Sequence, residues 1–277
     1  MLGRARSAIV YDSDASRHAS VSEIKELWRF RYLVRTLISK DLKVRYKRSA
    51  LGFIWVMLNP LLTLGVMTVV FSSLFRFDVP FYPTYLLAGI LLWNMFGQGS
   101  TASMSSLIGS GAVLKRMHVP PTVFIASSTG SALVNLSFAI VPFFFLAYIN
   151  GVPVRVTWLF IVVPIAGITV LTFGLGLTIA ALYIYFRDIF EIYNVVLTAY
   201  MYLTPVFYPV SILPPPLKAF ENYNPMYLFL SDARLAVTTG TLPPLNQILI
   251  PWSYALGACL IGWILFTRLE GGFAQNL

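Results

Sequence analysis

The chain has 277 residues, of which 57% are apolar, 15% are aromatic and only 11% are charged. A soluble domain carries roughly 25% charged residues, so this chain has too few charges to cover the surface of a water-soluble globule. The same composition excludes a disordered chain, which would be polar and poor in aromatic residues. A disulfide framework is excluded because Cys259 is the only cysteine. We therefore interpret the sequence as that of an integral membrane protein.

The net charge of +9 is unevenly distributed along the chain, because 12 of the 20 Lys and Arg residues precede Leu51. A basic arm can bind nucleic acid. When a long apolar run follows it directly, it is more typical of a cytoplasmic flank beside anionic lipids. We expect contacts with membrane lipids and no nucleic-acid partner.

Two segments before the first apolar run are expected not to cross the membrane. Residues 1–20 lack periodicity and are interpreted as a mobile tail, without the short apolar core of a cleavable signal peptide. Residues 21–50 are interpreted as an amphipathic helix in the plane of the membrane interface, since apolar and basic side chains fall on opposite sides over residues 21–46. A solvated helix packed on a partner remains the alternative.

Six apolar runs with no charged residue at their centres follow, within a single domain over residues 51–277. Each is near or above the roughly 20 residues that a membrane-spanning helix needs. The runs are Leu51–Phe75, Tyr82–Ile108, Pro121–Ile149, Trp158–Phe186, Ile192–Phe207 and Ile248–Thr267. With both termini in the cytoplasm, 16 Lys and Arg residues lie inside and four outside, as the positive-inside rule requires. The predicted fold is an all-α integral membrane protein with six transmembrane helices.

The Pro-rich stretch between the fifth and sixth runs is not an ordinary loop. Three consecutive prolines at 214–216 cannot continue a helix. Asn224 followed by Pro225 is a good helix start, and Gly240 is a natural stop. We expect short outer helices here that re-enter the membrane without crossing it. A seventh crossing is the alternative, and the charged residues Asp232 and Arg234 argue against it.

The six runs lack the groups that most membrane machines use for chemistry. They contain no Asp, Glu, Lys, Arg or His, which ion-coupled transporters and proton pumps need near the midplane. His18 and His118 lie in polar flanks, where solvated side chains are more common than metal ligands. No P-loop is present. We expect no catalytic residue, metal site or cofactor in this chain, so uphill transport would need energy from another chain.

Two short charged elements between the long helices are candidates for docking a cytoplasmic partner. The first is the turn over residues 109–121, and the second follows the fourth run. Ordinary positive-inside loops are the alternative. The candidate coupling residues are Lys115, Arg116, His118, Arg187 and Asp188.

Aromatic side chains gather around the end of the fifth run. Aromatic faces stack on sugar rings, although aromatic residues at the membrane interface are expected of any membrane protein. The candidate channel-lining residues are Tyr200, Tyr202, Phe207 and Tyr208.

A basic cluster precedes the first run, where a phosphate headgroup would meet the helix. Arg and Lys bind phosphate well, and anchoring to generic anionic lipids is the alternative. The candidate headgroup residues are Lys43, Arg45, Lys47 and Arg48.

The stretch LISKDLKVRYKRSALGFIWVMLNPL (Leu37–Leu61) resembles a signature of the type-2 ABC exporter permeases for polysaccharides and polyol phosphates. The similarity continues through the segments Lys115–Pro121, YFRD at 185–188, PVFYPVSILP at 205–214, and Asn224-Pro225 with Arg234 downstream. It covers the chain from about Val21 to the carboxyl end.

This resemblance implies a homodimer of six-helix permeases with two separate ATP-binding cassette subunits, which would bind ATP and Mg²⁺. It also implies a coupling turn over about 109–119, a gate within 209–240 and a channel between the two permeases. The substrate would be a lipid-linked glycan of the O-antigen (lipopolysaccharide), capsular or teichoic acid type, exported across the bacterial inner membrane. A permease for a drug or small lipid is the first alternative. A membrane enzyme acting on lipid phosphates is the second.

Overall fold

The computed structural model describes residues 26–47, 49, 51–70, 79–116 and 119–276. Within these ranges the chain is helical and contains no strand, which confirms the all-α prediction. The helices are α2 (Arg31–Tyr46), α3 (Trp55–Val70), α4 (Tyr82–Gly109), α5 (Gly111–Arg116), α6 (Thr122–Ile149), α7 (Val162–Tyr185), α8 (Ile189–Leu203), α9 (Pro215–Glu221), α10 (Pro225–Arg234), α11 (Leu245–Leu269) and α12 (Phe273–Asn276). Short 3₁₀ or π turns are at Gly52–Ile54, Val156–Ile161, Val210–Ile212, Leu235–Thr239 and Glu270–Gly272.

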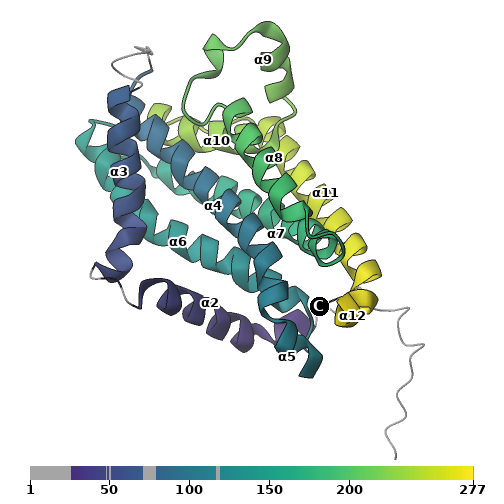
Figure 1. The fold of residues 1–277 in the computed structure, drawn as a ribbon. Coiled ribbons are helices and arrows are strands. Elements are labelled where there is room, and N and C mark those ends of the chain that lie inside the picture. The colour runs from purple at the N-terminus through teal and green to yellow at the C-terminus, as the bar shows by residue number, and fades with distance from the viewer. Residues whose placement is uncertain (1–25, 48, 50, 71–78, 117–118, 277) are drawn as a thin grey trace, which may run out of the picture.

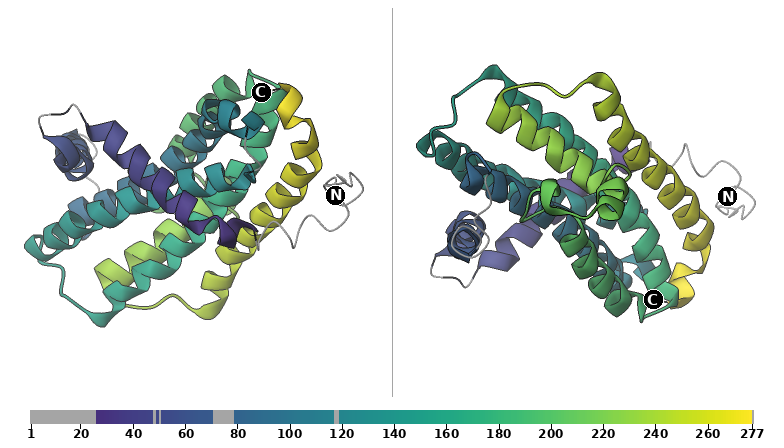
Figure 2. Two further views of the ribbon diagram at one scale, coloured as in Figure 1. Left: turned by 90° about the horizontal axis from the view of Figure 1, so that it is seen from below. Right: turned by 90° about the horizontal axis from the view of Figure 1, so that it is seen from above.

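Helix α2 lies across one end of the bundle, whereas α3 runs along its side (Figures 1 and 2). The apolar side of α2, which includes Leu33, Val34 and Leu37, packs against the smaller of two hydrophobic clusters in the described chain. Lys43 and Lys47 are exposed. Residues 26–29 are also helical, so the described chain is helical over residues 26–29 and 31–46, and its place in the membrane interface stays a prediction. We refer to the end of the bundle that carries α2, α5 and α12 as the α2 end, and to the opposite end as the α9 end.

Three helical stretches are long and apolar enough to cross a membrane. These are Thr122–Ile149, Val156–Tyr185 and Leu245–Gly272, with mean hydropathies of 2.1, 2.3 and 1.8. The shorter apolar helices Trp55–Val70 and Ile189–Leu203 are α3 and α8. At 1.5 Å per residue, the 15 residues of α8 span about 22 Å, less than the roughly 30 Å of a hydrocarbon core.

Helix α8 ends before the limit that the sequence suggested for the fifth run. The apolar stretch continues to Phe207, but the helix stops at Leu203 and Thr204 is extended, with a ψ of 133°. Pro205 explains this end, since the residue before a proline is disfavoured in helical conformation and the proline lacks an amide proton. Residues 204–207 are therefore buried, non-helical chain at the α9 end.

Helix α4 is the central element of the bundle, because it contacts α3, α6, α7, α8 and α10. Its 28 residues are enough to cross a membrane, yet α4 is not among the three strongly apolar spans. The reason is its carboxyl half, where polar residues begin at Asn94. Most of the buried residues of α4 precede this half and form the centre of the larger hydrophobic cluster.

Helices α7 and α11 approach each other through two glycines. A Cβ atom on Gly262 would collide with the carbonyl oxygen of Gly174, and one on Gly174 would collide with the backbone of Cys259. Absence of side chains at both positions lets the two backbones pack closely, as small residues do in membrane bundles.

The segment between α8 and α11 contains two short helices, as expected. Asn224 caps α10, its side-chain oxygen accepting from the amide of Tyr227 at 3.2 Å, and Pro225 occupies the first turn. Gly240 ends the helical stretch in the left-handed conformation, with a φ of 71°. The 10 residues of α10 span about 15 Å, too short for a crossing of their own.

Candidate functional site

The two predicted coupling elements lie together at the α2 end (Figure 1). Helix α5, which contains Lys115 and Arg116, contacts the carboxyl-terminal helix α12. Arg187, in the turn between α7 and α8, donates from Nη2 to the carbonyl oxygen of Asn276 in α12 at 3.4 Å. Asp188 is exposed and precedes the first turn of α8. The carboxyl-terminal helix therefore joins both elements, a role that the sequence analysis did not assign to it.

Parts of the predicted coupling and headgroup residues lie outside the described part of the chain. These comprise His118 and Arg48, together with the side chains of Lys115, Arg116 and Arg45. Lys43 and Lys47 are described and exposed at the end of α2 and in the following turn. Their role at a lipid headgroup stays a prediction.

The four aromatic residues predicted to line a channel occupy the α9 end of α8 and the chain that follows. Tyr200 packs edge-on against Trp93 and Phe96 of α4, with ring centres 5.5 and 6.2 Å away. Phe207 is buried, whereas Tyr202 is exposed. The hydroxyl of Tyr208, which is half-buried, donates to the carbonyl oxygen of Tyr202 at 2.6 Å. The structure thus clusters these residues at one end of the molecule, and whether they line a channel stays a prediction.

A buried arginine ties the same segment to α4. Arg234 is 5% exposed, and its two terminal nitrogens donate to the carbonyl oxygens of Pro205 and Val206 at 2.8 and 2.7 Å. Its Nε donates to the carbonyl oxygen of Tyr85 at 3.1 Å. The planar, multiply donating guanidinium suits such a fork of acceptors. Arg234 thereby holds the non-helical chain after α8 against α4.

A second polar cluster links the end of α8 to the turn between α9 and α10. The Asn224 amide nitrogen donates to Thr204 and to the carboxyl of Glu221, both at 2.9 Å, and the Tyr200 hydroxyl donates to the Asn224 side-chain oxygen. Glu221 is 1% exposed. Burial raises the pKa of its carboxyl from 4.5 to about 7, and the hydrogen bond from Asn224 opposes this only in part.

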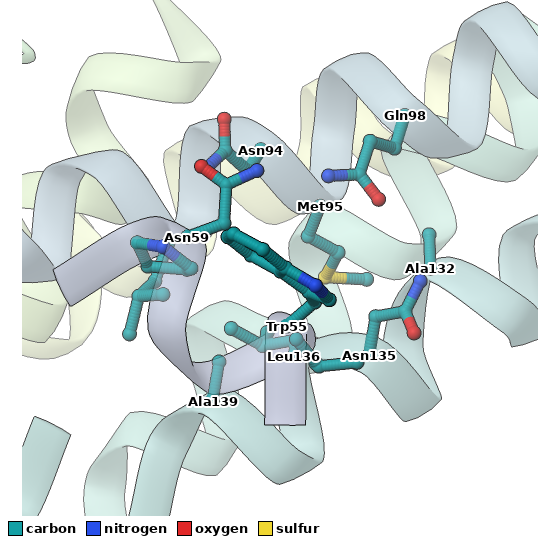
Figure 3. A pocket seen from close by; sticks show the side chains of 12 residues that line it. Trp55, Asn59, Asn94, Met95, Gln98, Ala132, Asn135, Leu136 and Ala139 are labelled. Atoms are coloured by element: carbon teal, nitrogen blue, oxygen red, sulfur yellow. The ribbon is translucent and has the colours of Figure 1, made fainter. Parts of the chain in front are cut away.

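A cleft of about 300 Å³ between α3, α4 and α6 is the site that sequence reasoning missed. Four side-chain amides line it, together with Trp55. Figure 3 shows the Trp55 indole in the middle, with Asn59 and Asn94 on one side and Gln98 and Asn135 on the other. We call this site the amide cleft. Its signal in the sequence was the isolated Asn and Gln residues within apolar runs, which the search for ionisable groups passed over.

The described residues provide no obvious metal site. Among them, no group of three His, Cys, Asp or Glu side chains is placed to hold a metal ion. The amide oxygens of the cleft are better suited to hydrogen bonding with neutral groups, since each primary amide offers two donors and one acceptor oxygen.

Comparison with known proteins places the chain in a family. The profile of the ABC-2 type transporter family matches residues 32–236. An O-antigen export system permease protein RfbA of Klebsiella pneumoniae is 28% identical over 260 residues, covering 92% of this chain and 99% of that protein. The RfbA protein of Myxococcus xanthus is 31% identical over 68% of this chain and 72% of its own length. The polysialic acid transport protein KpsM of Escherichia coli is 20% identical over 86% of this chain and 93% of its own length.

The matched region runs from α2 into the turn after α10, and so includes α5, the Arg187 turn, the amide cleft and Arg234. This multi-pass membrane chain belongs to the ABC-2 type transporter family.

Proposed function

We propose that this chain is the permease subunit of an ATP-driven exporter that moves a lipid-linked polysaccharide across the bacterial cytoplasmic membrane. The observation that carries the proposal is the similarity over nearly the whole chain to proteins named for O-antigen export. Identity to these proteins is higher than identity to the polysialic acid transport protein, which favours an O-antigen-like glycan over a capsular one.

The proposal includes six crossings, by α3, α4, α6, α7, α8 and α11, with both chain termini in the cytoplasm. The positive-inside distribution supports this orientation, and it makes the α2 end cytoplasmic. Helices α9 and α10 would then form the outer, re-entrant segment. Irregular buried chain such as residues 204–207 is tolerated at membrane depth where protein packs around it, and Arg234 supplies hydrogen bonds to its carbonyl oxygens.

Energy would come from two ATP-binding cassette subunits, which would hold ATP and Mg²⁺. Their docking surface would be the α2 end, where α5, the Arg187 turn and α12 meet. This grouping supports the proposal because elements in mutual contact, such as α5, the Arg187 turn and α12, can transmit a displacement to several long helices at once. The basic residues Lys43, Arg45, Lys47 and Arg48 would guide the anionic headgroup of the lipid carrier.

A second copy of the chain would complete the passage. Helix α8 has no buried residue in the single chain, and α3 has only Val56 and Leu64 buried. Apolar side chains such as Leu62 and Val66 of α3 are 54% and 64% exposed. Lipid covers such faces in a monomer, and a homodimer would bury part of them on either side of a channel that includes α4.

Deletion of the gene in its host tests this proposal. We expect surface glycan to disappear and lipid-linked glycan to accumulate in the cytoplasmic leaflet, and a plasmid copy to restore display. Purification of the tagged chain should recover a partner with a nucleotide-binding P-loop. Unchanged surface glycan, with loss of export of a drug or small lipid instead, would contradict the proposed substrate. Glycan-modifying activity of the isolated chain would contradict a transport role.

A further inference from the structure

Four polar residues of α4 follow one another along a single side of the helix. Asn94, Gln98, Thr101 and Ser105 are separated by four, three and four positions, which places side chains on one helical face. All four are exposed or half-buried in the single chain. Residues between them point into the protein: Met95, Phe96, Gly99, Ser100, Ser103 and Met104 are buried. We call this row the α4 stripe.

Three cavities follow the stripe from the α2 end toward the middle of the molecule. A cavity of about 330 Å³ between α2, α4 and α6 is lined by six serines, including Ser105, and by Lys40 and Asp41. A cavity of about 580 Å³ beside α8 contains all four residues of the stripe. The amide cleft of about 300 Å³ contains Asn94 and Gln98. Each of the three cavities therefore shares residues of the α4 stripe with another, and we call the stripe and the three cavities together the polar track.

The inner part of this track is polar but uncharged. The described residues that line the amide cleft and the cavity beside α8 include no Asp, Glu, Lys, Arg or His. Such a surface offers hydrogen-bond donors and acceptors together with the faces of Trp55 and Trp93. It therefore matches a ligand that is rich in hydroxyl groups and carries little charge where it touches the cleft.

Asn135 of α6 supplies a second observation about the cleft. It is only 8% exposed, and its side-chain oxygen has no hydrogen-bond partner among the described residues. Leaving a buried acceptor unpaired is unfavourable. Polar side chains in membrane bundles often bond one helix to another, but this oxygen makes no such bond.

Three serine side chains near the track differ from Asn135 in this respect. The hydroxyls of Ser106, Ser127 and Ser128 donate to carbonyl oxygens of their own helices at 2.8 to 3.0 Å. Their presence is explained by helix geometry alone. Asn135 lines the cleft, and its side-chain oxygen has no donor among the described residues.

We propose that the amide cleft and the α4 stripe bind the sugar units of the exported glycan as it passes, with hydroxyl groups donating to Asn135 and exchanging hydrogen bonds with Asn94 and Gln98. This inference rests on the proposed function and adds the residues that contact the glycan. Each neutral hydrogen bond contributes only modestly to binding. Weak, repeated sites of this kind let a polymer enter and also leave, as transport requires.

Paired substitutions by apolar residues of similar length, which remove hydrogen bonding, test the inference in the complete transporter. The chain with both Asn135→Leu and Gln98→Met should restore at least about tenfold less surface glycan than the unaltered chain at equal protein amounts. Loss of one or two bonds corresponds to about 1.4 kcal/mol, or tenfold. Asn135→Gln, which keeps an amide, should retain most of the display. The matched control is Ser137→Ala, two positions along α6, whose hydroxyl donates to Leu133 of its own helix.

The outcomes separate this inference from the proposed function. Equal surface glycan with the double variant and with Ser137→Ala would overturn the inference while leaving the exporter intact. Absence of surface glycan with the unaltered chain would instead overturn the proposed function.

A second measurement reports occupancy directly and uses the single native cysteine. In a Cys259→Ala background, Gln98→Cys would be labelled with a charged methanethiosulfonate in membranes of the host. Labelling should be several-fold slower in glycan-producing membranes than in membranes of a host unable to attach the first sugar to the lipid carrier. Ser211→Cys, exposed near the α9 end, should react equally in both. Equal rates at position 98, or no labelling in either membrane, would overturn the inference.

Discussion

The guanidinium carbon of Arg234 lies 3.6 Å from the centre of the Tyr85 ring, and the Arg234 Nε donates to the Tyr85 carbonyl oxygen. One side chain therefore both stacks on α4 and bonds to its backbone. The two terminal nitrogens of Arg234 donate to the carbonyl oxygens of Pro205 and Val206. A single residue therefore connects α10, α4 and the non-helical chain after α8. Gly89 leaves the room for this fork, because a Cβ atom there would collide with Arg234 and the Val206 carbonyl.

Arg234→Lys is expected to destabilise the chain by several kcal/mol. A lysine keeps the charge but cannot reproduce the planar fork, so it leaves buried carbonyl oxygens unpaired at about 1–3 kcal/mol each. Thermal unfolding of the detergent-purified protein, followed by size-exclusion chromatography with fluorescence detection, gives the measurement. Arg268→Lys, at an exposed position of α11, is the matched control and should unfold like the parent. Equal midpoints for both variants would contradict the role assigned to Arg234.

Gly262→Ala is expected to weaken the packing of α7 against α11. The added Cβ atom would collide with the Gly174 carbonyl oxygen, and overpacking of this kind typically costs about 1–3 kcal/mol. Gly257→Ala in the same helix adds a Cβ atom with nothing within 4 Å and should be neutral or slightly stabilising. The two unfolding midpoints should therefore move apart, and a shared shift would show that α11 does not approach α7 as described.

Stability of the α9 end should fall as the pH rises from about 4.5 to about 7. Burial raises the pKa of Glu221 to about 7, so the folded chain keeps a proton that the unfolded chain loses above 4.5. The stabilisation from the proton on Glu221 is complete below about pH 4.5. It is lost as the pH rises through the folded pKa of about 7, and stability changes no further above that pH. Thermal midpoints at pH 5.5 and pH 8 measure the effect.

Glu221→Gln should flatten this difference, since glutamine can accept from Asn224 at any pH. The control is Glu191→Gln, on the exposed surface of α8. A pH dependence that survives Glu221→Gln unchanged would assign the effect to another group.

Lys115→Glu combined with Arg116→Glu should uncouple ATP hydrolysis from export. Both residues lie in α5, which contacts α12 at the proposed docking surface, and reversal of two charges there should disturb contact with the ATP-binding subunit. Surface glycan should fall at least tenfold while the chain stays in the membrane. Lys218→Glu, exposed on α9 at the other end, reverses a charge without this effect. Full export by the double variant would exclude α5 from coupling.

Composition and apolar runs predicted the helices well, because membrane-spanning segments have a strong signal in hydropathy. The ends depended on local chemistry: Asn224 with Pro225 and Gly240 were readable in the sequence and mark the ends of the outer helical stretch. Helix α8 was predicted to reach Phe207, because its apolar run hides the break at Pro205. Hydropathy alone does not identify α4 as a crossing, because the polar carboxyl half of α4 lowers the mean hydropathy of this helix.

The candidate site was harder to predict, because its parts come from distant positions. The search for charges found the exposed residues near α2 and α5 but not the amide cleft, where Asn59, Asn94 and Asn135 meet from three helices. In the sequence, Arg234 argued against a seventh crossing and belonged to the family resemblance, and the structure places it against Tyr85 and Val206. Contacts between residues that are between about thirty and 149 positions apart leave no mark in local periodicity.

Transport by purified components tests the central claim most directly. Proteoliposomes containing the chain and its ATP-binding subunit, loaded with lipid-linked glycan extracted from the host, should translocate that glycan only when MgATP is hydrolysed. Vesicles with the chain alone should retain the glycan even when an ion gradient is imposed. Translocation by the chain alone, driven by the ion gradient and indifferent to ATP, would contradict the account.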